Sequence, residues 1–203
     1  MGEMLPPYID IEDVVLTLHL RSRLKSGLCI HRRMDIKPLT YNGRDEGISV
    51  TLSTILKPGD DEDKISEAVL NLFPEASFDP LEEETFPSQR NAVIECLNLS
   101  LETFLTLIRQ QAILDTAMDA MAKNLDGNST SFSISRLAAF ANKIAFTYEE
   151  VPLGGCFTIQ LQGSGLADWI EAVTWHNGRQ EIPRQLNDDL AMLQDGEAAT
   201  WHQ

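Results

Sequence analysis

The sequence is short of cysteine, of basic residues and of long hydrophobic runs. Its three cysteines are too few for a disulfide framework, which suits a reducing compartment. No apolar run approaches the roughly 18 residues that a membrane span needs. The N-terminus also lacks the basic and then apolar regions of a secretory signal. These absences predict a cytoplasmic protein without membrane partners.

Signatures of catalysis and of cofactor binding are missing as well. The glycines at 154–155 and 163–165 lack the residues that complete a nucleotide-binding loop, so we interpret them as turns. Cys29 and His31 have the spacing of two zinc ligands, but no second close pair completes a tetrahedron. None of the four histidines lies in a recognisable catalytic motif. We therefore expect no metal, no cofactor and no enzymatic activity.

What the sequence has in excess is negative charge. There are 31 acidic and 16 basic residues, which gives a net charge of −15. Residues 1–47 are neutral overall, so the rest of the chain carries the excess. A field of this sign repels phosphate backbones at long range. The acidic surface either maintains solubility or faces a basic or cationic partner.

Composition divides the chain into three parts. Residues 1–47 read as an N-terminal extension or an extra hairpin. Residues 48–176 have the periodic hydrophobicity of a folded domain. Residues 177–203 are polar and acidic, and we expect an acidic, partly disordered C-terminal tail.

Hydrophobic periodicity predicts the elements of the central domain. Strict alternation is typical of strands, and apolar residues at every third or fourth position are typical of helices. The expected order is a strand from Ile48 to the turn at Pro58 and Gly59, a helix from the acidic residues 60–63 to Pro74, a strand at 91–97, helical sequence at 100–125, a strand at 130–134 and a helix at 166–173.

The helical sequence at 100–125 changes its apolar face partway along. The face of its second half lies about 150° round from that of the first half. Either one helix is buried on two sides, or the segment breaks between Arg109 and Ile113. We favour the break, because a surface helix rarely needs two opposed apolar stripes.

Residues 136–161 contain the clearest local pattern. A short amphipathic segment leads into alternation from Ile144 to Tyr148, then a Pro/Gly turn, then alternation from Phe157 to Leu161. This pattern predicts a half-buried antiparallel hairpin. The residues expected in the core are Phe146, Phe157, Ile159 and Trp169. The whole domain is then α+β, with helices packed on one face of a mostly antiparallel sheet.

Three segments also have distinctive sequence motifs. They are ISEAVLNLFPE (65–75), RQQAILDTAMDAM (109–121) with its sequel GNSTSF (127–132), and RLAAFANKIAF…PLGG (136–155). In this order and with these gaps, they resemble an archaeal family of small proteins catalogued as candidates for RNA binding. Genes of that family often lie beside one for a dephospho-CoA kinase. The resemblance covers roughly residues 48–175.

The resemblance implies a fold similar to that of the large-subunit ribosomal protein that binds 5S rRNA. It also implies a non-enzymatic module that binds structured RNA. The family positions that carry basic or amide side chains here, and that become candidate RNA-binding residues, are Arg109, Gln111, Arg136 and Lys143.

Two other functions remain open. One is a protein-interaction or regulatory module, whose acidic surface binds a protein partner or a second copy of the chain. The family's gene neighbourhood links that module to a kinase of the CoA pathway or of nucleotides. The other is an enzyme whose site is assembled from scattered residues. A continuous basic stripe would favour RNA, whereas an acidic surface with one apolar patch would favour protein.

Overall fold

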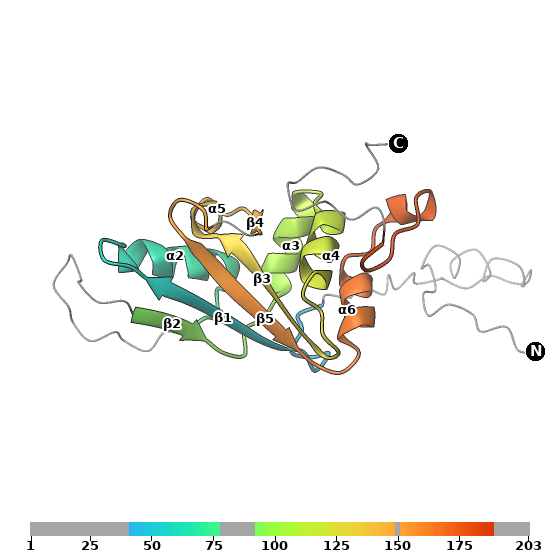
Figure 1. The fold of residues 1–203 in the computed structure, drawn as a ribbon, viewed down its shortest axis with the longest axis horizontal. Helices are drawn as coiled ribbons and strands as arrows, with labels where there is room; N and C mark the ends of the chain where they lie inside the picture. Colours follow the sequence, from blue (N-terminus) through green and yellow to red (C-terminus); the bar gives the residue numbers. More distant parts are fainter. Residues whose placement is uncertain (1–40, 78–91, 149–150, 189–203) are drawn as a thin grey trace, which may run out of the picture. The chain divides into compact units, whose positions relative to one another are not determined.

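A computed structural model describes residues 41–77, 92–148 and 151–188 (Figure 1). The chain separates into two units, Met1–Pro38 and Leu39–Gln203, and every described residue belongs to the second. The zinc-spaced Cys29 and His31, and most of the predicted N-terminal extension, lie outside the described residues. No helix within the described ranges combines the length and the hydropathy needed to cross a membrane.

Five strands form one antiparallel sheet, which confirms the α+β class with a mostly antiparallel sheet. They are β1 (Ser49–Leu56), β2 (Ala92–Cys96), β3 (Ser129–Ser135), β4 (Phe146–Thr147) and β5 (Cys156–Gln162), in the order β2-β1-β5-β3-β4. The similarity to the 5S rRNA-binding ribosomal protein stays a prediction.

The register places alternate residues on two faces with different chemistry. One cross-strand row contains Cys96, Leu52, Ile159 and Phe132, and all four side chains are buried. The neighbouring row, on the other face, contains Glu95, Ser53, Thr158 and Ser133. Alternation in the sequence therefore directs one face of the sheet to the core and leaves the other face largely polar, with Ile55 and Val93 as an exposed apolar pair on it.

Within the described residues, five α-helices supply the apolar side of the core. They are α2 (Glu62–Leu72), α3 (Glu102–Gln110), α4 (Leu114–Ala122), α5 (Arg136–Phe140) and α6 (Leu166–Val173), followed by the 3₁₀ helix η1 (Asn177–Gln180). The acidic start of α2 follows the prediction: Asp61 caps the helix by accepting a hydrogen bond from the Lys64 amide. In Figure 1, α2 and α5 lie side by side over one end of the sheet, and α4 and α6 lie together at the other.

The predicted break in the helical sequence is confirmed. The first helix, α3, ends at Gln110, and α4 begins at Leu114. Between them Ala112 has φ +55°, a left-handed conformation that interrupts a helix. The swing of the apolar face in the sequence was the signal for this change of direction.

The predicted hairpin between 144–148 and 157–161 is wrong in its pairing. Strand β4 pairs with β3, and β3 lies between β4 and β5. The reason is that α5 carries the chain back to the free edge of β3, where only two residues of β4 pair. Alternation shows that a segment suits a sheet, but it does not show which strand lies beside it.

Three of the four expected core residues are buried. Phe157 and Ile159 are fully buried, and Trp169 is 7% exposed. The prediction for Phe146 was wrong, because this side chain is only half-buried on the short strand β4. It packs at the margin of the core, with its ring centroid 5.9 Å from that of Phe132.

Both ends of the predicted central domain have contacts with flanking residues. On the N-terminal side, Asn42 accepts a hydrogen bond from the Leu101 amide, and Glu46 accepts one from the Trp169 indole. On the C-terminal side, Arg179 is buried and forms an ion pair with Asp115 of α4. The described unit thus includes parts of the predicted extension and tail.

Candidate functional site

Arg136, one of the predicted RNA-binding residues, is the buried first residue of α5. Its side chain is nearly inaccessible, and its Nη2 lies 3.1 Å from the Asp60 carboxylate. Its Nε donates a hydrogen bond to the carbonyl of Gly154. A guanidinium held in this way braces the start of α2 against the turn before β5, and it is not presented to a phosphate.

The side-chain amide of Gln111 is hydrogen-bonded to the main chain of Ile144. Its Oε1 accepts a hydrogen bond from the Ile144 amide at 2.7 Å, and its Nε2 donates one to the Ile144 carbonyl at 2.9 Å. Both ends of the side-chain amide are thereby used inside the fold. The structure does bring Gln111 next to the loop that contains Lys143, but the contact consists of hydrogen bonds that hold this loop in the fold.

The other two candidates, Arg109 and Lys143, are exposed. Arg109 extends toward α6, where its Nη2 donates a hydrogen bond to the carbonyl of Val173 at 3.2 Å. With Arg136 buried and Gln111 engaged, the four predicted residues do not form one accessible cluster. The sequence gives the charge of a side chain but not its surroundings, and here the surroundings differ for each residue.

The described arginines other than Arg109 are held in ion pairs with carboxylates. These pairs are Arg44 with Glu75, Arg136 with Asp60, Arg179 with Asp115 and Arg184 with Asp119. Each pair neutralises a cation that a phosphate backbone would otherwise contact.

The open face of the sheet also lacks the chemistry of a phosphate-binding surface. Its cross-strand rows contain Thr51 with Gln160 and Ser131, and Ser49 with Gln162 and Ser129. These hydroxyl and amide side chains are neutral. At these positions the open face is therefore polar without being basic.

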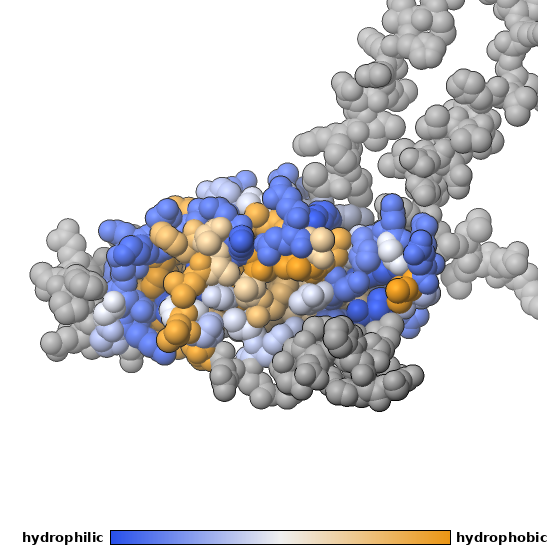
Figure 2. Space-filling model, turned by 90° about the horizontal axis from the view of Figure 1, so that it is seen from above, coloured by the Kyte–Doolittle hydropathy of each residue, from blue (hydrophilic) through white to orange (hydrophobic). Residues whose placement is uncertain are grey.

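A different feature stands out on the surface: exposed hydrophobic side chains gather around α5 and the turn before β5. We call this set the apolar patch, and Figure 2 shows hydrophobic residues on the α5 side of the molecule. The exposed fraction of its side chains runs from 41% for Phe140 to 89% for Leu153. The patch consists of Ile55, Val93, Leu137, Phe140, Val151 and Leu153.

A hollow of about 300 Å³ lies within the apolar patch. Ile55, Val93 and Val151 line it from β1, β2 and the turn, and Cys156 and Arg136 also contribute. Leu137 lies against Gly154, so close that a Cβ on that glycine would lie 2.7 Å from the leucine Cγ. The hollow and the exposed face of α5 are thus joined by the turn.

The sequence builds this turn from glycines because side chains would not fit. Gly154 and Gly155 both have φ +81°, which side chains rarely adopt. A Cβ on Gly155 would lie 1.9 Å from Nη2 of Arg136. The two glycines leave room for the buried Arg136 guanidinium beneath the turn. The same turn keeps the side chains of Val151 and Leu153 exposed.

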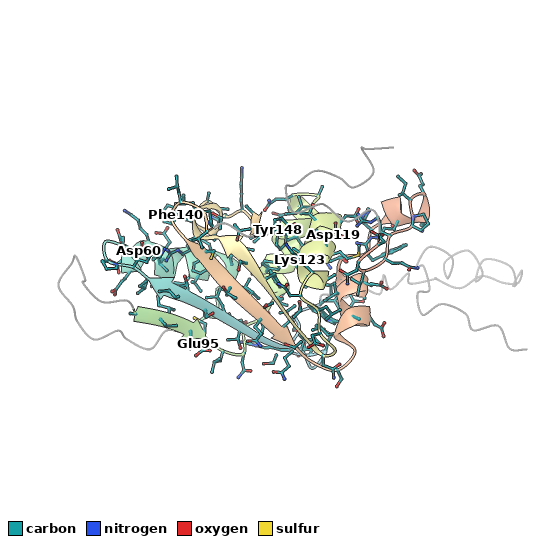
Figure 3. All side chains as sticks on the ribbon, viewed as in Figure 1. Asp60, Glu95, Asp119, Lys123, Phe140 and Tyr148 are labelled. Atoms are coloured by element: carbon teal, nitrogen blue, oxygen red, sulfur yellow. The ribbon has the colours of Figure 1, made fainter. Side chains whose placement is uncertain are left out.

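Acidic groups stand at the margin of the apolar patch. Asp60, labelled in Figure 3, meets Arg136 beside the hollow, and the acidic residues 61–63 follow it in the chain at the start of α2. Lys57 lines the hollow as a basic side chain on the same side. Among the described residues, no group of three His, Cys, Asp or Glu side chains is placed to hold a metal ion.

The patch was missed at the level of sequence. Val151 and Leu153 flank a proline and read as part of a turn, and the pair Leu137 and Phe140 reads as the apolar side of a short amphipathic segment. The sequence signal available for the patch was a turn flanked on both sides by apolar residues that were not needed to build the core.

Comparison with known proteins identifies relatives in archaea. A UPF0201 protein of Sulfurisphaera tokodaii is 34% identical over 130 residues, which are 62% of this chain and 88% of the relative. A UPF0201 protein of Methanopyrus kandleri is 35% identical over 111 residues, 52% of this chain and 69% of the relative. No family model matches the chain.

Solved structures show the same fold. The crystal structure of a UPF0201 protein from Methanococcus jannaschii superposes with a TM-score of 0.54 at 24% identity, over 64% of this chain and 96% of that one. A second UPF0201 crystal structure gives a TM-score of 0.53 at 21% identity, over 69% of this chain and 97% of that one. The overlap corresponds to a domain shorter than the present chain.

Proposed function

The chain belongs to the UPF0201 family of archaeal proteins, and we propose that this member is a non-enzymatic protein-interaction module. The surface that binds is the apolar patch, and the partner is a protein segment that is itself apolar and basic.

The observation that carries this proposal is a hollow lined by three exposed hydrophobic side chains, with further exposed ones on the adjoining turn and on α5. Ile55, Val93 and Val151 line the hollow, and the others are Leu137, Phe140 and Leu153. Single exposed hydrophobic residues are normal, but a contiguous group with a cavity at its centre is typical of interaction sites. Burial of one such side chain contributes about 1.5–3 kcal/mol, so two or three anchors in the hollow supply useful affinity.

Charge gives the partner its second property. The chain has a net charge of −15; Asp60 meets Arg136 at the hollow, and the acidic residues 61–63 follow it at the start of α2. A basic segment is attracted by this field and an acidic one is repelled, which affects the association rate above all. The proposal therefore commits to a partner with Lys or Arg between its apolar anchors.

RNA binding, which the resemblance implied, stays a prediction with less support. Of the four candidate residues, Arg109 and Lys143 are the exposed cations that remain for it. A link to a kinase stays a prediction as well, since no residue contact bears on it.

The test measures fluorescence anisotropy of three probes with the full chain at about 0.15 M salt. The probes are a peptide with two leucines and one phenylalanine separated by lysines, the same peptide with glutamates in place of the lysines, and a single-stranded RNA of similar charge. We expect the lysine peptide to bind at least about tenfold more tightly than the glutamate peptide.

The matched variants distinguish binding at the apolar patch from nonspecific hydrophobic binding. A double substitution, Val151→Ser with Leu153→Ser, removes apolar surface without changing charge and should weaken lysine-peptide binding by about tenfold. Ile182→Ser removes an equally exposed residue outside the patch and should leave binding unchanged. Equal effects of the two variants, or binding of RNA alone, would contradict the proposal. Self-association that only the double variant abolishes would replace the partner by a second copy.

A further inference from the structure

A second hollow of about 300 Å³ lies away from the apolar patch, at the edge of the sheet between α4 and β3. It shares no lining residue with the first hollow. Its lining includes Lys123, Asn124, Ser131, Ser133 and Tyr148.

The short strand β4 creates this hollow. The pairing of β4 with β3 is confined to Ser133 and Ile134, so the preceding residues of β3 have β5 on one side and no strand on the other. Asn124 occupies part of this edge, where its Nδ2 donates a hydrogen bond to the Ser131 carbonyl at 2.8 Å. The space left between α4 and the end of β4 is the hollow.

A cation and an aromatic ring stand together at its wall. Lys123 follows the last turn of α4, and its Nζ lies 4.8 Å from the centre of the Tyr148 ring. Figure 3 shows these two side chains next to each other, with Asp119 close by. Such a cation–π contact holds the ammonium in place while leaving its N–H groups free to donate.

The phenol of Tyr148 remains a hydrogen-bond donor at neutral pH. Burial raises its pKa, and the negative charge of Asp119 raises it further. Asp119 itself is paired with Arg184 at 2.7 Å, so its charge is largely balanced. The exposed Lys123 therefore gives the lining a basic character unusual for this acidic chain.

We propose that this hollow binds a sugar phosphate, either as a free metabolite or as the ribose-phosphate part of a nucleotide. The Lys123 ammonium pairs with the phosphate. Polar groups that Asn124, Ser131 and Ser133 contribute to the lining exchange hydrogen bonds with sugar hydroxyls. The Tyr148 ring packs against the apolar side of the sugar. The volume lies at the small end of the range for ligand sites, which suits one sugar phosphate.

The experiment titrates the full chain with ribose 5-phosphate, adenosine 5′-monophosphate and inorganic phosphate, and follows binding by calorimetry. Because the sugar hydroxyls contribute, ribose 5-phosphate should bind at least about tenfold more tightly than inorganic phosphate. Equal affinity for ribose 5-phosphate and the nucleotide would identify a free sugar phosphate as the ligand. A nucleotide that binds about tenfold more tightly would identify the nucleotide as the source.

Variants attribute the binding to the hollow. Lys123→Met should weaken ribose 5-phosphate by about tenfold, and Ser133→Ala by a smaller factor, with the melting temperature of each showing that the fold is kept. Lys143→Met, which removes an exposed lysine outside the hollow, is the control and should have no effect. No saturable binding at about 10 mM ligand, or an equal loss in the Lys143 variant, would overturn the proposal. The Val151 and Leu153 double variant should bind normally, so this result is independent of the apolar patch.

Discussion

Gln111 holds both main-chain polar groups of Ile144 with its side-chain amide. The Ile144 amide donates to Oε1, and the Ile144 carbonyl accepts from Nε2. This clasp fixes the loop before β4 against the break between α3 and α4. A residue that the resemblance assigned to RNA thus uses both ends of its side-chain amide inside the fold.

We predict that Gln111→Met destabilises the protein by about 1–3 kcal/mol, because the polar groups of the buried Ile144 lose their partners. Gln110→Met is the matched control: it changes an exposed neighbour and should alter the free energy of unfolding by less than about 0.5 kcal/mol. Urea unfolding of both variants measures the difference. Equal stabilities would show that the clasp contributes nothing.

Gly155 and Gly59 provide a second matched pair. Both have positive φ, but a Cβ on Gly59 meets open space, whereas one on Gly155 meets the Arg136 guanidinium. We expect Gly59→Ala to cost about 1–2 kcal/mol from backbone strain alone. Gly155→Ala should cost at least about 2 kcal/mol more, because the arginine must also move. Similar thermal shifts for the two variants would refute the tight packing of Arg136.

Arg136 and Arg109 distinguish a structural arginine from an exposed one. Removal of Arg136 takes the ion-pair partner from Asp60 and a hydrogen-bond donor from the Gly154 carbonyl, so Arg136→Met should destabilise the protein by about 3–5 kcal/mol. Arg109→Met should have little effect on stability, and it should reduce RNA binding only if RNA is a ligand. A stable Arg136 variant that has lost RNA binding would restore the original assignment.

Asp115 makes stability depend on pH. Burial alone would raise the pKa of its carboxyl, but hydrogen bonds from His176 and Arg179 outweigh burial and lower this pKa below its ordinary value. The carboxylate therefore stabilises the fold above its ordinary pKa, and this contribution is lost as pH falls through the lower folded pKa.

Asp115→Asn should consequently cost about 1–2 kcal/mol at neutral pH, a modest figure because the carboxylate is partly exposed. The difference between wild type and variant should shrink as the pH falls below the ordinary pKa of an aspartate carboxyl, because the wild-type carboxylate then begins to protonate. Unfolding free energies measured across this range check the trend, with the exposed Asp126→Asn as control. A difference that grows as pH falls would contradict the assigned role of Asp115.

The local sequence pattern predicted where the helices and strands lie better than it predicted which strands pair with each other. The swing of the apolar face predicted the break between α3 and α4, and alternation located β1, β3 and β5. The same alternation did not show that β4 pairs with β3, because pairing depends on where α5 returns the chain.

The site was harder to predict than the fold, for a physical reason. The sequence does not distinguish an exposed arginine from a buried one. Arg109 is exposed, whereas Arg136 is paired with a carboxylate under a glycine turn. Likewise, Leu153 reads as one more apolar residue, and its exposure follows only from the turn that holds it outward.

The most direct test of the apolar patch is a map of peptide binding by nuclear magnetic resonance. The uniformly ¹⁵N-labelled full chain is titrated with the lysine peptide, and the amide shifts of all assigned residues are followed. The account predicts that the largest shifts fall on Ile55, Val93, Val151 and Leu153. Shifts that instead centre on Arg109 and Lys143, or a spectrum that does not change with peptide but changes with RNA, would contradict it.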